Sequence, residues 1–122
     1  MEESTIITSI RVKNLDGNEV DLISKYREKI LLVIIYNNDC LGCTGRAVPL
    51  AYEFQQKYDA IQVIGIHSDF ENRVGTKENI KGIFTSGEIP FPIYIDEHHH
   101  VYDQFNSEGT PQWLLITLEH TL

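Results

Sequence analysis

Residues 30–43 read ILLVIIYNNDCLGC: an apolar run rich in β-branched residues, then a short polar stretch, then two cysteines in a CxxC spacing. A continuous apolar run of this length is typical of a strand that is buried on both faces of a sheet. Beyond the first cysteine, apolar residues recur at three- and four-residue steps, which predicts a helix from Cys43 to Tyr58 with one buried stripe. Pro49 is expected to kink this helix or to lie close to its start. The stripe consists of Ala47, Ala51, Phe54 and Tyr58.

The remaining elements alternate between strands and helices. Residues 14–18 (NLDGN) predict a turn, because Asp-Gly favours the positive φ that hairpin turns need. This order predicts an α/β fold with an N-terminal β-hairpin and a largely parallel sheet, whose binding sites lie in the loops that follow the strands. Further strands are expected at Ile6–Val12, Glu19–Ile23, Ile61–His67, Pro92–Ile95 and Trp113–Thr117. Further helices are expected at Lys77–Ser86, closed by Gly87, and at Val101–Phe105.

Length and charge restrict the class of protein. A chain of 122 residues is predicted to form a single domain over residues 1–122. The net charge of −8 argues against binding to nucleic acid and to anionic membrane surfaces, both of which attract basic proteins. The longest apolar run has the length of a strand, so no membrane span is expected. The first residues, MEESTIITSI, lack the basic and apolar order of a signal peptide, and we therefore expect a cytoplasmic location.

The CxxC spacing at a helix start predicts a redox-active pair. There, free backbone N–H groups and the positive end of the helix dipole favour a thiolate, which is the nucleophilic form of cysteine. Cys40 is therefore expected to attack a disulfide, and Cys43 to resolve the mixed disulfide that results. No bound cofactor is expected, because the Cys40–Cys43 pair itself carries the electrons.

Two other uses of the cysteines stay open from the residues alone. The pair is then either buried and inert or half of a zinc site, which needs two more ligands. His98–His100 is the one histidine cluster in the sequence, but consecutive residues do not share one face of an element. A solvated turn is therefore the favoured interpretation, and no metal is expected. His67, at a strand end, is interpreted as a structural histidine, and Asp96 as a turn cap.

Four segments carry a resemblance to a known family: IRVKNLDGNEVDL, LLVIIYNNDCLGC, IQVIGIHSD and PFPIYIDEHHHVYDQFNSEGTPQWLLI. They resemble the thioredoxin-fold redoxins, a branch that includes peroxiredoxins and TlpA-like thiol-disulfide oxidoreductases. The resemblance implies an enzyme that exchanges disulfides with a protein or a small thiol and is regenerated by a reductase. It also implies that the Thr110–Pro111 bond is cis, beside the cysteines, where Thr110 pairs with an extended substrate strand. Leu41 and Gly42, between the cysteines, are expected to contact the same substrate.

Several positions depart from the family pattern. Asp39 replaces the tryptophan before the first cysteine; its carboxylate either opposes formation of the Cys40 thiolate or is a helix N-cap or a solvated loop acid. Arg46 replaces a glutamate and either supports that thiolate by its charge or faces solvent. The strand Ile30–Tyr36 contains no acid that could shuttle protons. Asn37 replaces the hydroxyl residue that orients peroxide in peroxiredoxins, which weakens the interpretation as a peroxide reductase.

The C-terminal part is shorter than the family pattern, in which one more strand and a terminal helix follow. We therefore expect a thioredoxin-like fold shortened at its C-terminus, with an uncovered sheet edge that invites a homodimer. Two functions are carried forward. The first is a thiol-disulfide oxidoreductase that uses Cys40 and Cys43. The second is a non-catalytic binding or assembly module with the same fold.

Overall fold

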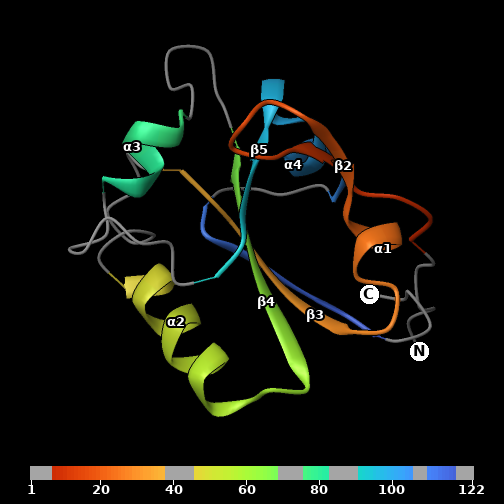
Figure 1. The fold of residues 1–122 in the computed structure, drawn as a ribbon, viewed down its shortest axis with the longest axis vertical. Coiled ribbons are helices and arrows are strands. Elements are labelled where there is room, and N and C mark those ends of the chain that lie inside the picture. Colours follow the sequence, from red (N-terminus) through yellow and green to blue (C-terminus); the bar gives the residue numbers. More distant parts are fainter. Residues whose placement is uncertain (1–6, 38–45, 69–75, 83–90, 106–109, 118–122) are drawn as a thin grey trace.

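The computed structural model of the protein describes residues 7–37, 46–68, 76–82, 91–105 and 110–117. Strands and helices alternate along the chain after an N-terminal hairpin, as predicted (Figure 1). The strands are β1 (Arg11–Lys13), β2 (Glu19–Asp21), β3 (Ile30–Tyr36), β4 (Ile61–Ser68), β5 (Ile93–Asp96) and β6 (Gln112–Ile116). The helices are α1 (Leu22–Lys25), α2 (Val48–Lys57), α3 (Lys77–Lys81), the 3₁₀ turn η2 (Glu97–His99) and α4 (His100–Gln104).

The strands form one mixed sheet in the order β2-β1-β5-β4-β3-β6. β3, β4 and β5 run parallel, while β6 pairs antiparallel with β3 and β1 pairs antiparallel with β5. Because parallel strands end at the same edge of a sheet, the residues at the ends of β3, β4 and β5 lie close together. We call this the carboxyl edge; it is formed by Asn37, Ser68 and Asp96.

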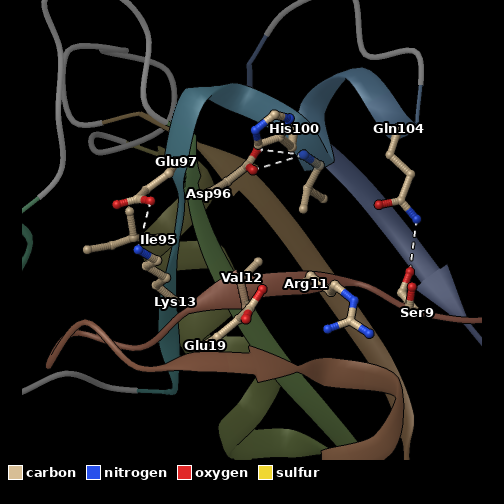
Figure 2. Close-up of a pocket in the computed structure, with 11 residues that line it drawn as sticks. Ser9, Arg11, Val12, Lys13, Glu19, Ile95, Asp96, Glu97, His100 and Gln104 are labelled. Atoms are coloured by element: carbon tan, nitrogen blue, oxygen red, sulfur yellow. Dashed lines mark hydrogen bonds and ion pairs between the residues drawn. The ribbon is translucent and has the colours of Figure 1, made fainter.

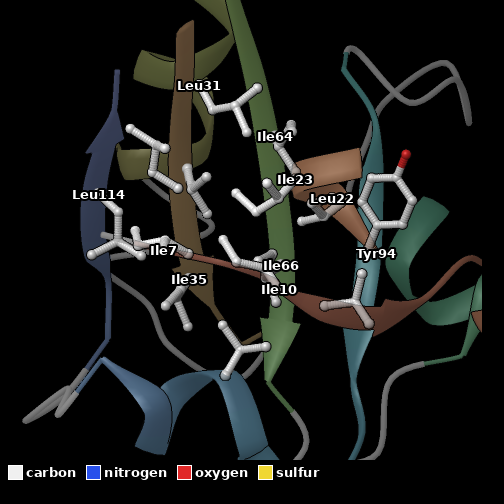
Figure 3. Packing of buried hydrophobic residues seen from close by; sticks show 14 residues of the cluster. Ile7, Ile10, Leu22, Ile23, Leu31, Ile35, Ile64, Ile66, Tyr94 and Leu114 are labelled. Carbon is white, nitrogen blue, oxygen red and sulfur yellow. The ribbon is translucent and has the colours of Figure 1, made fainter. Parts of the chain in front are cut away.

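Strand β3 is buried on both faces, as its apolar run predicted. Its residues alternate between two apolar clusters, with Val33 and Ile35 in the first and Ile34 and Tyr36 in the second. Residues of α1 and α4 pack in the first cluster, and residues of α2 and α3 pack in the second (Figure 1). Figure 3 shows the first cluster, where side chains from β3, β4, β6 and α1 meet. The sheet is therefore covered by helices on both sides.

The predicted turn at residues 14–18 is confirmed. Asn14 closes it, because its Oδ1 accepts hydrogen bonds of 2.9 Å from the backbone N–H groups of Asp16 and Asn18. Gly17 has a φ of +89°, a conformation that favours glycine, and a Cβ added there would meet nothing within 4 Å. The tip of the hairpin is therefore well ordered by its own hydrogen bonds and open around Gly17.

Asp21 explains why both hairpin strands are shorter than predicted. The strand expected at Ile6–Val12 begins only with β1, because the N–H of Ile10 donates to Asp21 Oδ1 at 3.0 Å. The strand expected at Glu19–Ile23 ends at Asp21, whose Oδ1 also accepts from the N–H of Ile23 at 3.1 Å and so caps α1. Both predicted bounds were therefore wrong at the same place, where the Asp21 carboxylate accepts from the N–H groups of Ile10 and Ile23.

Helix α2 places Pro49 in its first turn, where the missing N–H is tolerated. Of the two alternatives predicted for Pro49, the position near the helix start is the one observed. The predicted stripe is buried at Ala47 and Ala51 and half-buried at Phe54. Tyr58 is 48% exposed, because the chain has left the helix there and is extended, with φ −127° and ψ 94°.

The other predicted elements occur with shifted bounds. β4, β5, β6 and α4 begin or end one residue away from their predicted positions. α3 ends at Lys81, before Gly82, and not at Ser86; glycine is a poor helix former, which accounts for the earlier end. Residues 83–90, which include Gly87, and residues 43–45 of the helix predicted from Cys43 lie outside the described residues.

Strand β6 is the last strand of the sheet on its side of β3 among the described residues. Leu115 on this strand is 50% exposed. Side chains of a strand point to the faces of the sheet, so this exposure concerns a face, and the uncovered edge expected from the sequence stays a prediction. The homodimer that this edge would support stays a prediction, as does the single domain over the whole chain.

Gly65 on β4 allows Tyr36, Phe91 and Ile93 to pack closely against the sheet. A Cβ at this position would lie 3.1 Å from Phe91 Cε2, 3.2 Å from Ile93 Cγ1 and 3.5 Å from Tyr36 Cε1. We therefore expect Gly65→Ala to lower the free energy of unfolding by about 1–3 kcal/mol, the usual cost of overpacking a core. Urea denaturation followed by circular dichroism measures this change.

Gly17→Asn is the matched control for that variant. It also places a side chain at a glycine, but in open space, and asparagine tolerates a positive φ better than other residues. Its free energy of unfolding should stay within about 0.5 kcal/mol of the unchanged protein. If Gly65→Ala were as stable as this control, the close packing around Gly65 would be refuted.

Candidate functional site

Most residues of the predicted site lie in the segment 38–45, which we call the cysteine segment and which lies outside the described residues. The roles assigned to its residues therefore stay predictions. Arg46 is exposed just before α2, and both alternatives for its role stay predictions. Thr110 and Pro111 are half-buried before β6. The cysteine segment contains Asp39, Cys40, Leu41, Gly42 and Cys43.

Thr110 and Pro111 lie beside the end of β3 that leads into the cysteine segment. β3 and β6 are antiparallel, and Ile35 is opposite Gln112. The next residues on the two sides are therefore Tyr36, at the end of β3, and Pro111, just before β6. The Thr110–Pro111 bond is cis, as the resemblance implied. The register thus brings Thr110 and Pro111 to the end of the sheet at which β3 leads into the cysteine segment.

Asn37 is the last described residue before the cysteine segment, and it is buried. Its side chain is 4% exposed, and its Nδ2 donates a hydrogen bond of 2.9 Å to the backbone carbonyl oxygen of Ser68. A buried amide needs such a partner, because an unpaired polar group inside a protein costs about 1–3 kcal/mol. Asn37 therefore ties the end of β3 to the end of β4.

A buried carboxylate at the end of β5 continues these contacts. Asp96 is 1% exposed, and its Oδ2 accepts a hydrogen bond of 2.8 Å from Ser68 Oγ. Its two oxygens also accept from the backbone N–H of Val101 at 2.9 Å (Figure 2). A second backbone donor, the N–H of Tyr102, lies 3.0 Å from Oδ2. Asp96 thus caps the turn into α4, as predicted, and hydrogen bonds join three neighbouring strand ends.

We call Asn37, Ser68 and Asp96 the edge network. Sequence reasoning identified Asp96 as a cap, but it assigned no role to Ser68 and considered Asn37 only as a missing hydroxyl. A signal for the network was present, because one polar residue stands at the end of each of three apolar strands. Parallel strands end at one edge, so three such residues are brought together whenever their strands are neighbours.

Two buried rings lie next to the edge network in the chain. Tyr36 is fully buried, and its hydroxyl has no hydrogen-bond partner among the described residues. Its ring meets that of His67 edge to face, with centroids 5.4 Å apart and 82° between the planes. Burial raises the pKa of Tyr36 far above its usual value, so the phenol stays neutral at neutral pH. His67 is 2% exposed, which agrees with its interpretation as a structural histidine.

A pocket of about 350 Å³ lies between β1, β5 and α4 (Figure 2). Its lining carries charges of both signs, including an ion pair of 3.0 Å between Lys13 Nζ and Glu97 Oε1. It shares Asp96 with the edge network, but Thr110 and Pro111 do not line it. The pocket is therefore separate from the substrate-contacting residues predicted from the sequence, and its balanced charges favour no particular ligand.

The histidine cluster lies in the 3₁₀ helix η2 and at the first residue of α4, and not in the solvated turn expected from the sequence. His99 has a φ of +51°, and its Nδ1 lies 3.0 Å from Asp103 Oδ2 at the surface. His100 is exposed at the start of α4, and the side chain of His98 is not among those described. Within the described ranges, no three His, Cys, Asp or Glu side chains gather as metal ligands do. In this same part of the chain, no helix has the length and apolar character needed to cross a membrane.

Comparison with known proteins gives the family to which the chain belongs. Residues 5–121 match the AhpC/TSA family, so the chain belongs to that family of redoxins. The chain is also similar to the thiol-disulfide oxidoreductase YkuV of Bacillus subtilis (strain 168), with 28% identity over 90 residues and 73% of this chain covered. The match spans 60% of the length of that relative.

Solved structures confirm the thioredoxin-like fold. A thiol-disulfide isomerase from Corynebacterium glutamicum superposes with a TM-score of 0.78 at 25% identity, over 96% of this chain and 81% of that one. A Chlorobium tepidum protein assigned as a thiol:disulfide interchange protein DsbE gives 0.78 at 15% identity, over 99% and 82%. The thioredoxin domain of a Bacteroides vulgatus thiol-disulfide oxidoreductase gives 0.71 at 17% identity, over 99% and 85%.

Asp96 should make a large contribution to stability. Asp96→Ala leaves the hydroxyl of Ser68 and the N–H groups of Val101 and Tyr102 without their acceptor. We expect the free energy of unfolding, measured in urea, to fall by about 3 kcal/mol. Asp103→Ala is the control, because this carboxylate is exposed and pairs with His99 at the surface; it should cost less than about 0.5 kcal/mol. A loss below about 1 kcal/mol for Asp96→Ala would contradict its role as a buried acceptor.

Tyr36→Phe should leave the protein equally stable or stabilise it by up to about 1 kcal/mol, because a buried hydroxyl without a partner is unfavourable. Tyr94→Phe is the matched control: the Tyr94 hydroxyl lies 2.7 Å from that of Tyr26, and its removal should cost about 1 kcal/mol. Thermal and urea unfolding measure both changes. A clear loss of stability for Tyr36→Phe would mean that its hydroxyl is paired after all.

Proposed function

We propose that the protein is a thiol-disulfide oxidoreductase that works through Cys40 and Cys43. One observation carries this proposal: in a member of the AhpC/TSA family, the register of Ile35 with Gln112 brings Thr110 and Pro111 beside the point where β3 enters the cysteine segment. The CxxC pair and the substrate-contacting pair are thereby assigned to one end of the sheet, where loops of α/β folds build their sites.

The reaction is two successive thiol-disulfide exchanges. The Cys40 thiolate attacks one sulfur of a substrate disulfide, so that a mixed disulfide forms and the other substrate sulfur leaves as a thiolate. The Cys43 thiolate then attacks Cys40 Sγ, which forms the Cys40–Cys43 disulfide and releases the second substrate thiolate. Two electrons pass to the substrate, and the two thiolates take up protons from water. A separate reductase returns the pair to the dithiol, and no bound cofactor takes part.

The start of α2 supports the choice of nucleophile. Ala47, just before Val48, already has helical backbone angles, with φ −66° and ψ −43°, so the helical conformation extends from α2 toward the cysteine segment. Uncapped N–H groups and the helix dipole stabilise a nearby thiolate. The cysteine segment ends just before this helix in the sequence.

A protein disulfide is the substrate class that the surroundings favour. Leu50, in the first turn of α2 and seven residues beyond Cys43 in the sequence, is 53% exposed, so it is available for contact with a partner protein. Thr110 and Pro111 are accessible in part, and we propose that they contact the partner chain together with Leu41 and Gly42.

The peroxide reductase receives less support. In that alternative a hydroxyl group near the nucleophile would orient the peroxide, and Asn37 occupies the position that the family pattern gives to it. The amide of Asn37 is already bound to the carbonyl oxygen of Ser68. A non-catalytic binding module remains the second candidate, because Asp39 stands beside Cys40 in the sequence, where a carboxylate would oppose formation of the thiolate.

Replacement of each cysteine separates the enzyme from the binding module. Cys40→Ser should reduce the dithiothreitol-driven reduction of a protein disulfide to the uncatalysed rate, because the attacking thiolate is lost. Cys43→Ser should instead accumulate a mixed disulfide between Cys40 and the substrate, visible by intact mass under non-reducing conditions. Ser24→Ala, an exposed change from hydroxyl to hydrogen on α1, is the control and should leave the rate unchanged. Unchanged rates in both cysteine variants would reject the oxidoreductase in favour of the binding module.

A further inference from the structure

Each residue of the edge network is hydrogen-bonded to a neighbouring strand or helix. Asp96 holds Ser68 through a hydroxyl at 2.8 Å and is itself held by the backbone of α4. Ser68 in turn receives the amide of Asn37 on its carbonyl oxygen at 2.9 Å. All three side chains are at most 4% exposed. Hydrogen bonds of this kind are short, shielded from water and therefore rigid.

The network ends where the cysteine segment begins. Cys40 is three residues beyond Asn37, so the chain between their Cα atoms spans at most about 11 Å. No other described residue that precedes the cysteine segment is closer to it in the sequence. A restraint on Asn37 therefore acts on the backbone three residues before Cys40.

We propose that Asn37, Ser68 and Asp96 position the cysteine segment and thereby set the reduction potential of the Cys40–Cys43 pair. This inference rests on the proposed function. The three residues are positioning residues: they act through the backbone at the end of β3, and none of them is assigned a contact with substrate.

The direction of the effect follows from the effective concentration of one thiol at the other. A backbone held at its origin limits the conformations of the dithiol, which keeps the two sulfurs close and favours the disulfide. If the restraint is lost, the dithiol gains conformational freedom, whereas the oxidised ring stays limited by its own covalent bond. The equilibrium then moves toward the dithiol, and the reduction potential becomes less negative.

Two variants weaken the edge network to different extents. Asn37→Ala removes the amide that reaches Ser68, and should shift the equilibrium with glutathione about tenfold toward the dithiol, which is about 30 mV for two electrons. Ser68→Ala keeps the carbonyl acceptor but loses the hydroxyl that binds Asp96. It is the milder change, so it should shift the equilibrium in the same direction by about threefold.

Two controls separate the network from general destabilisation. Ser24→Ala makes the same chemical change as Ser68→Ala. It also breaks a Ser–Asp hydrogen bond, that of Ser24 Oγ with Asp21 Oδ2 at 3.2 Å. Ser24 lies on α1 and takes no part in the edge network. Ile66→Val lowers stability by about 0.5–1.5 kcal/mol from within the core of β4. Both should keep the wild-type reduction potential, because neither touches the edge network.

The measurement is a redox titration in graded glutathione buffers, with alkylation and intact-mass readout, after circular dichroism has shown that each variant is folded. Shifts in Asn37→Ala and Ser68→Ala, with both controls unchanged, support the inference. Potentials within twofold of wild type in the folded variants overturn it while leaving the proposed function intact; if Asn37→Ala does not fold, Ser68→Ala alone decides. A wild-type protein that forms no reversible Cys40–Cys43 disulfide overturns the proposed function and this inference together.

Discussion

Strand β3 offers neither face to solvent, and this constraint organises the rest of the molecule. Its side chains alternate between two apolar clusters, so helices are required on both sides of the sheet. Polar side chains are too costly along such a strand and are found instead where it ends. The carboxyl edge therefore combines two properties that chemistry needs, a rigid apolar support and a local set of hydrogen-bonding groups.

The site is supported from two directions. From one side, the edge network ties the end of β3 to β4, β5 and α4. From the other, the antiparallel partner β6 brings Thr110 and Pro111 to the same end. Both supports consist of residues far apart in the sequence, so they come together only in the folded chain.

Particular residues show which parts of this structure can be predicted from the sequence. The bounds of β3 were predicted correctly, because burial on both faces leaves an uninterrupted apolar run. The hairpin strands were predicted too long, because the hydrogen bonds of Asp21 leave no trace in apolar periodicity. The contact of Asn37 with Ser68 joins residues 31 positions apart, and it depends on strand order, which local patterns do not determine. The redox role of the cysteine pair, by contrast, was predicted from its spacing along the chain alone, and it stays a prediction.

Asp21 has a consequence for how the protein can be modified. Its carboxylate joins the segment at Ile10 to the start of α1, so the base of the hairpin is closed independently of the hairpin's length. The tip at Gly17 is open to its surroundings and lies at the far end of β1 and β2 from that closure. Peptides inserted at the tip would lengthen a surface loop, which costs little free energy. The hairpin is therefore a suitable attachment point for a reporter or an affinity sequence. Its strand β2 is the first in the sheet order, whereas β3, which leads into the cysteine segment, is next to the last.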